Sequence, residues 1–107
     1  MIVKTYKGVN IANEGILSAV IVQFNKDLLL AGFSTSFDLN SSLVCFETNF
    51  LAWINVAYDE QRAKFIRLLY SVDVNEGKIF NSSIDKIGQL IIEREFQKVV
   101  LRKYFNP

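Results

Sequence analysis

The feature that most constrains the fold of this chain is the shortness of its apolar runs. Residues 16–22 form one run that only Ser18 interrupts, and residues 28–33 form a second run that ends in Ser-Thr-Ser. A membrane-spanning helix needs about twenty apolar residues, so we expect neither run to cross a membrane. Polar residues typical of turns follow both runs. In a chain of 107 residues this pattern predicts one core and a single domain over residues 1–107.

Four segments in the first half of the chain have the composition of β-strands. Apolar and β-branched residues occupy roughly alternate positions over residues 2–11, and residues 16–24 are rich in Val and Ile. Large apolar and small polar side chains alternate in the later part of residues 28–39. Residues 43–47 combine aliphatic and aromatic side chains, which favours a fourth strand.

The segment from residue 43 to residue 58 supports two interpretations. Apolar side chains at every second position after residue 50 are typical of a strand. Another set of apolar and aromatic side chains falls on one helical stripe: Phe50, Trp53, Ile54, Ala57, Tyr58, Gln61 and Phe65. The β-branched content favours an extended segment up to residue 56, but whether 48–58 is strand or helix stays open.

Two helices are predicted in the second half. Residues 59–71 begin with Asp59 as a natural N-cap and place apolar side chains on one face. A final helix begins after Ser82 or Ser83 and runs to about residue 104. The sequence therefore predicts an α+β fold, in which an antiparallel meander of about four strands packs against two helices, the last at the C-terminus.

Catalytic and metal-binding chemistry is poorly represented in the sequence. The absence of histidine removes the commonest general base and the commonest metal ligand. Cys45 is the single cysteine, and we expect it to be a buried apolar side chain of a protein in a reducing compartment. Ser83 and Lys86 have the spacing of some acyl enzymes, but a serine at a helix start is ordinarily a cap. We therefore expect no catalytic residues, no metal, no cofactor and no enzymatic activity.

Charge is distributed unevenly along the chain. Residues 27–61 contain five acidic residues and no basic residue, whereas residues 62–107 contain nine basic and five acidic residues. Aromatic residues among charges of one sign are typical of protein interfaces. The sequence therefore predicts a partner-binding surface, although Trp53 and Tyr58 fit a core position equally well. The residues of the predicted surface are Asp38, Glu47, Trp53, Tyr58, Asp59 and Glu60.

A second candidate surface lies on the predicted C-terminal helix. Arg94, Lys98 and Arg102 recur every four residues and would form a basic stripe. The alternative interpretation is a solvated helix face, since cations are also favoured near a helix C-terminus. With a net charge of only +1, neither this stripe nor the chain as a whole predicts a nucleic-acid partner.

In its organisation the chain resembles the small cytoplasmic immunity proteins that bacteria pair with polymorphic or contact-dependent toxins. The shared features are a length near a hundred residues, the lack of histidine, an aromatic-rich first half, the helix start at residues 58–62 and a basic last helix. The resemblance implies a cytoplasmic, non-enzymatic inhibitor that neutralises a toxin domain, such as a nuclease, by direct contact.

Two other classes of function are compatible with the sequence. A homodimeric structural, assembly or chaperone-like module would use apolar elements as its interface. A small enzyme that relies on carboxylates, lysine or tyrosine would require several of these groups to converge in a pocket.

Overall fold

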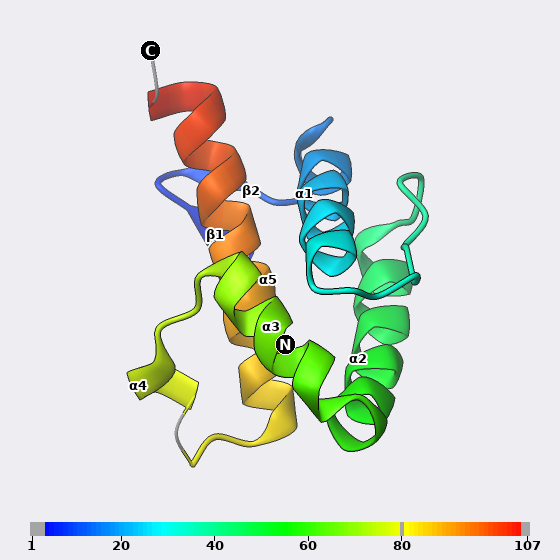
Figure 1. Cartoon of the computed structure of the whole chain (residues 1–107). Helices are drawn as coiled ribbons and strands as arrows, with labels where there is room; N and C mark the ends of the chain where they lie inside the picture. Colours follow the sequence, from blue (N-terminus) through cyan, green and yellow to red (C-terminus); the bar gives the residue numbers. More distant parts are fainter. Residues whose placement is uncertain (1–3, 80, 106–107) are drawn as a thin grey trace.

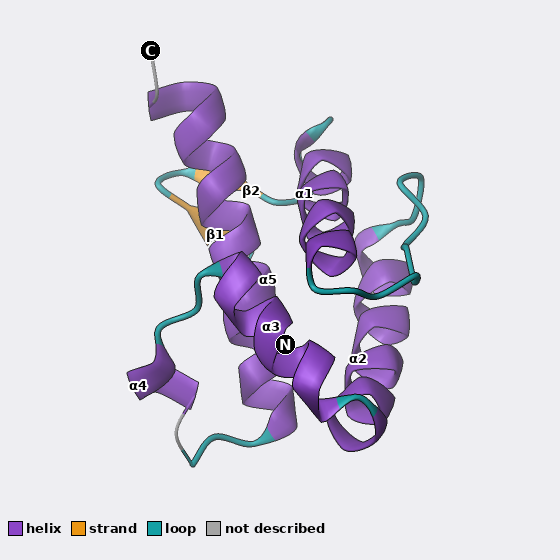
Figure 2. Cartoon of the chain, in the orientation of Figure 1, coloured by secondary structure: helices purple, strands orange, loops and turns teal. Residues whose placement is uncertain are grey.

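The computed structural model describes residues 4–79 and 81–105, and this part of the chain is largely helical (Figures 1 and 2). Its elements in chain order are β1 (Thr5–Tyr6), β2 (Val9–Asn10), α1 (Ile16–Leu30), α2 (Leu43–Glu60), α3 (Arg62–Val72), α4 (Glu76–Ile79), α5 (Ile84–Val100) and the π-helical turn η1 (Leu101–Phe105). Helices α1, α2 and α3 all pack against α5, which makes α5 the central element of the fold.

The predicted α+β fold with a four-strand meander is wrong. Residues 16–24 belong to α1, residues 28–39 form the end of α1 and a loop, and residues 43–56 belong to α2. Within the described residues, the sheet consists of β1 and β2, which pair as a two-stranded antiparallel hairpin. The predicted strand 2–11 is therefore a short hairpin, and its residues 2 and 3 lie outside the described part.

The sequence of α1 shows why the strand prediction failed. Its buried side chains recur at helical spacing: Ile16, Val20, Ile21, Gln23, Phe24, Asp27 and Leu28. A β-branched residue weakens a helix by only about 0.5 kcal/mol, whereas burial of its side chain contributes about 1.5–3 kcal/mol. Packing against the core therefore outweighs the local β preference. The helical spacing of the apolar residues indicated the correct structure for this segment, whereas its content of β-branched residues indicated a strand.

Helix α2 resolves the ambiguous segment in favour of the helical stripe. The side chain of Ser42 caps the helix by accepting a hydrogen bond from the backbone N–H of Cys45 at 3.2 Å. Phe46, Phe50 and Ile54 are buried one turn apart and face the core. Cys45 is exposed, so the prediction of a buried cysteine is wrong.

The two helices predicted in the second half are present, with one boundary shifted. Asp59 lies in the last turn of α2 and is not the cap of α3, because the chain leaves helical geometry only at Gln61, with φ −133° and ψ 50°. The start of α5 is as predicted, since Ser83 Oγ accepts a hydrogen bond from the Lys86 N–H at 3.2 Å. The helical path then continues through η1 to Phe105.

Aromatic side chains fill the space between α1, α2 and the loop that joins them. Phe37 from this loop lies edge-on to Phe46 and Trp53, with ring centroids 5.7 Å and 5.9 Å apart. Asn25 holds the loop on α1, because its Nδ2 donates to the Phe37 carbonyl at 3.0 Å and its Oδ1 accepts from the Phe37 N–H at 2.8 Å. The aromatic cluster consists of Phe24, Phe33, Phe37, Phe46, Phe50 and Trp53.

Candidate functional site

The predicted acidic surface is dispersed in the structure. Asp38 lies in the loop between α1 and α2, while Glu47 lies near the start of α2 and Asp59 and Glu60 lie at its end. Twelve residues of helix separate Glu47 from Asp59, which corresponds to about 18 Å along the axis. The six predicted residues therefore do not form one continuous site.

The two aromatic members of that predicted surface belong mainly to the core. Trp53 lies edge-on to Phe33 and Phe24, with ring centroids 5.2 Å and 6.0 Å apart. Tyr58 lies edge-on to Phe65 at 5.4 Å and remains partly exposed. Trp53 is therefore a core residue, whereas Tyr58 packs on the core and also lines a groove on the surface.

The predicted basic stripe is directed at neighbouring elements. Arg94 pairs with Asp73, whose Oδ2 lies 3.3 Å from Arg94 Nη2. Arg102 Nη2 donates to Gln23 Oε1 at 3.1 Å across the α1–α5 interface. Lys98 is mostly buried in the same interface. These three side chains hold the fold together and do not present a common basic face.

Lys98 belongs to a buried polar cluster that sequence reasoning did not find. Its Nζ lies 3.0 Å from Asp27 Oδ2 on α1 and 2.7 Å from Glu95 Oε1 on α5. Gln23 completes the cluster by donating from Nε2 to Asp27 Oδ2 at 3.2 Å. A signal was present in the sequence, because Glu95 follows Ile87 and Ile91 at intervals of four residues and so falls on the buried stripe of the last helix.

Burial changes the protonation of Glu95. The side chain is fully buried, and neither carboxyl oxygen has a hydrogen bond of good geometry within the described residues. The pKa of Glu95 rises to about 8, mainly because burial penalises its charged form and also because its protonated form can donate to Asp27, while Lys98 opposes the rise. Glu95 is therefore mainly neutral at pH 7, and Lys98 neutralises Asp27.

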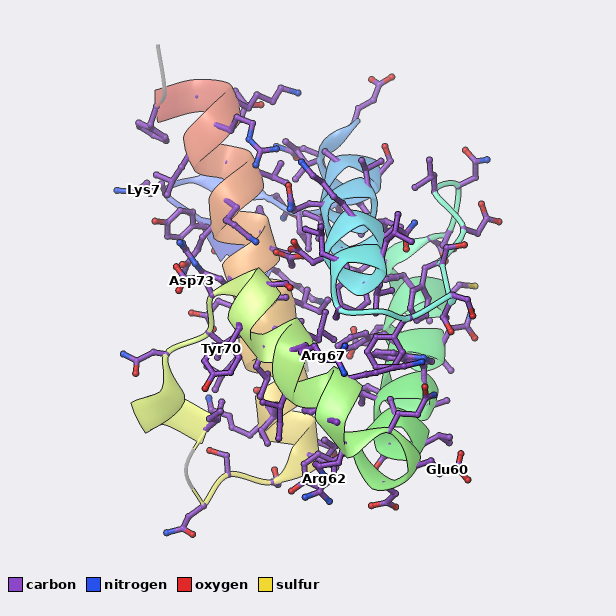
Figure 3. All side chains as sticks on the ribbon, in the orientation of Figure 1. Lys7, Glu60, Arg62, Arg67, Tyr70 and Asp73 are labelled. Carbon is purple, nitrogen blue, oxygen red and sulfur yellow. The ribbon has the colours of Figure 1, made fainter. Side chains whose placement is uncertain are left out.

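A mainly apolar groove of about 430 Å³ runs along α3. We call it the α3 groove. Its walls come from α3, the end of α2, the segment after α3 and the start of α5. The lining residues are Tyr58, Arg62, Phe65, Ile66, Leu69, Tyr70, Val74, Ile79, Asn81 and Ile87. Figure 3 shows Arg62 and Tyr70 at two positions along this helix.

Exposed apolar side chains continue the groove onto the surface of α3. Ile66 and Tyr70 lie one turn apart and are 46% and 67% exposed. Arg62 lies one turn before Ile66, with its guanidinium carbon 3.8 Å from the centre of the Tyr58 ring and its Nε donating to the Tyr58 carbonyl at 2.7 Å. We call these three exposed residues, Arg62, Ile66 and Tyr70, together with the groove, the α3 surface.

The charge of α3 is positive and uncompensated. The helix contains Arg62, Lys64 and Arg67 and no acidic residue. Within the described residues, none of the three side chains forms an ion pair. Among the side chains that the structure describes, Arg62 is the one charged residue in the lining of the groove. The α3 surface is therefore apolar with positive charges beside it.

A second, more polar depression of about 410 Å³ lies on the other side of Val74. Its polar groups come from Asp73, Asn75, Glu93, Arg94 and Gln97, and both partners of the Arg94–Asp73 ion pair lie in its lining. Within residues 4–79 and 81–105, no three His, Cys, Asp or Glu side chains gather in a way that could hold a metal ion. No helix in the same part of the chain is long and apolar enough to span a membrane.

Comparison with protein-family models, with curated proteins and with solved structures gave no match. The functional argument therefore depends on the residues of the chain itself.

Proposed function

We propose that this chain is a protein-binding domain that acts by contact and uses the α3 surface to hold its partner. The observation that carries the proposal is the exposure of Ile66 and Tyr70 on one helix face beside an apolar groove of about 430 Å³. Exposed apolar side chains that adjoin a groove are typical of sites where another protein binds.

The composition of the α3 surface supports a protein partner with acidic character. Tyrosine and arginine are the residue types that contribute most to binding energy at protein interfaces. Arg62 is already held in place by Tyr58, so its ordering on binding costs little side-chain entropy. A partner that inserts apolar side chains into the groove and places carboxylates near Arg62 and Arg67 would match both features.

Within this class, we propose an inhibitor of the immunity-protein type that neutralises a bacterial toxin domain in the cytoplasm. The resemblance in length and composition supports this narrower assignment. The structure changes the expected surface, because the acidic residues of 27–61 are dispersed while α3 is basic and exposed. The proposed contact on the toxin is therefore an acidic and apolar patch, and not the basic cleft of a nuclease.

The test replaces Ile66 by glutamate, which puts a charge into the groove wall and repels an acidic partner. The matched control is Val22→Glu, because Val22 is a β-branched residue on α1 with nearly the same exposure. Neighbouring genes are searched for a toxin-like protein, whose binding is measured by calorimetry. For Ile66→Glu this binding should fall at least about 30-fold, or 2 kcal/mol. Equal binding by wild type and Ile66→Glu would refute the assignment of the α3 surface.

A further inference from the structure

The outer face of α2 is unusual for a solvent-exposed helix. Over three and a half turns its exposed side chains carry no charge: Val44, Cys45, Thr48, Asn49, Ala52, Asn55 and Val56. Val44 is 74% exposed and Val56 is 53% exposed. Solvated helix faces normally alternate charged residues of both signs, so a long uncharged face indicates a surface that is covered.

Ala52 lies near the centre of this face. At 100° per residue, the seven side chains span an arc of about 140°, and Ala52 lies close to the middle of that arc. Ala52 also lies midway between Val44 and Glu60 along the helix. Asn55 donates from its Nδ2 to the Leu51 carbonyl at 2.8 Å, so its side chain folds back onto its own helix. A second helix can therefore approach closely at Ala52.

The charges at the two ends of α2 indicate which helix fits. Asp59 and Glu60 lie in the last turn, where the helix dipole is negative and each carboxylate costs about 0.3–1 kcal/mol. The first turn contains no acidic residue, so the positive end of the dipole is not compensated by a side-chain charge. Figure 3 shows Glu60 at the end of α2 that adjoins α3.

We propose that the outer face of α2 is a homodimer interface, in which the α2 helices of two copies pack antiparallel and cross at Ala52. In this arrangement each pair of carboxylates, Asp59 and Glu60, lies beside the uncompensated N-terminus of the other copy's α2. The same symmetry places Val56 of one copy level with Thr48 of its partner. The interface is isologous, because a two-fold axis at Ala52 maps the face onto itself.

The dimer uses none of the residues of the α3 surface, because Tyr58, which α2 contributes to the α3 groove, does not belong to the outer face of α2. Contact between one pair of helices buries less than a standard interface of about 1,600 Å², so the association is weak and readily reversible. Its carboxylate–dipole contacts are screened by salt, so association should weaken as ionic strength rises.

The first experiment measures self-association of the full chain by analytical ultracentrifugation up to millimolar concentration. Wild type should show a monomer–dimer equilibrium, and Ala52→Glu should be monomeric, because it puts two carboxylates together at the two-fold axis. Ala63→Glu is the matched control, since Ala63 is also an exposed helical alanine but lies on α3. A monomeric wild type, or a dimer that Ala52→Glu leaves unchanged, overturns the proposal.

The second experiment tests the antiparallel direction by oxidative cross-linking, and it does not depend on the folding of Ala52→Glu. In the double variant Cys45→Ser, Ala52→Cys, the two thiols meet at the axis and should form an intermolecular disulfide. In wild type the two copies of Cys45 lie about 21 Å apart along the paired helices, too far for a disulfide. Cross-linking of wild type as fast as the double variant would refute the antiparallel arrangement.

Discussion

Glu95→Gln should make the protein more stable at alkaline pH while leaving its stability at acid pH nearly unchanged. Glutamine has the shape of the protonated glutamic acid but cannot ionise. Glu95 is enclosed by Asp27 on α1 and Lys98 on α5, and burial raises its pKa from the ordinary 4.5 to about 8. Below pH 4.5 the group is protonated in both the folded and the unfolded chain, so its ionisation contributes nothing there.

The magnitude follows from the difference between the two pKa values. From pH 4.5 to about 8 the unfolded chain releases a proton that the folded chain retains, so the folded state loses about 1.4 kcal/mol of stability per pH unit. Once the pH exceeds both values, the accumulated loss is about 5 kcal/mol. Domains of this size are stable by about 5–15 kcal/mol, so the effect is a large part of the total.

The assay is urea unfolding of wild type and Glu95→Gln at several pH values between 4 and 9. Trp53 serves as the fluorescent probe, because its ring lies within the aromatic cluster. The difference between the two proteins cancels the titration of all shared groups. Glu93→Gln is the control, since Glu93 lies on the same helix and is only partly buried. A difference between wild type and Glu95→Gln that varies by less than about 1 kcal/mol across this range would refute the buried, neutral Glu95.

Two further substitutions test the packing of the fold. Asn25→Ala removes both hydrogen bonds to the Phe37 backbone and should cost about 1–3 kcal/mol in urea unfolding, whereas Asn55→Ala, which loses one bond within its own helix, should change stability much less. Gly88→Ala places a Cβ 3.2 Å from Phe50 Cε2 and 3.3 Å from Ile54 Cδ1. The cost of this overpacking should exceed the gain in helix propensity, so the melting temperature should fall by several degrees. An unchanged or higher melting temperature for Gly88→Ala would show that the overpacking between α2 and α5 costs no more than the gain in helix propensity.

The sequence was sufficient for the elements whose signals are local. Ser83 marked the start of the last helix correctly, because a capping side chain acts on the backbone three residues away. The first half failed because Val and Ile were weighted by their β preference, although their spacing in α1 was helical. The spacing of the apolar residues distinguishes a helix from a strand better than any other local signal in this segment.

The candidate sites were harder to predict because they depend on which helices meet. Asp27 and Lys98 are 71 residues apart in the chain, and their contact exists only because α1 packs against α5. Tyr58, which the sequence placed in the acidic surface, instead lines the α3 groove. Ile66 and Tyr70 lie in the helix predicted over residues 59–71, and only the structure shows that their side chains are exposed.

The corner between α2 and α3 has a consequence for how binding could be detected. Gln61 is the one residue between the two helices, yet its N–H donates to the Ala57 carbonyl at 2.9 Å and its carbonyl accepts from the Phe65 N–H at 2.9 Å. Gln61 thus takes part in the last turn of α2 and in the first turn of α3. We expect a partner that tilts α3 to shift the end of α2 as well, about two turns after Trp53. The intrinsic fluorescence of Trp53 should therefore change when a partner binds at α3, so that binding can be followed without an attached dye.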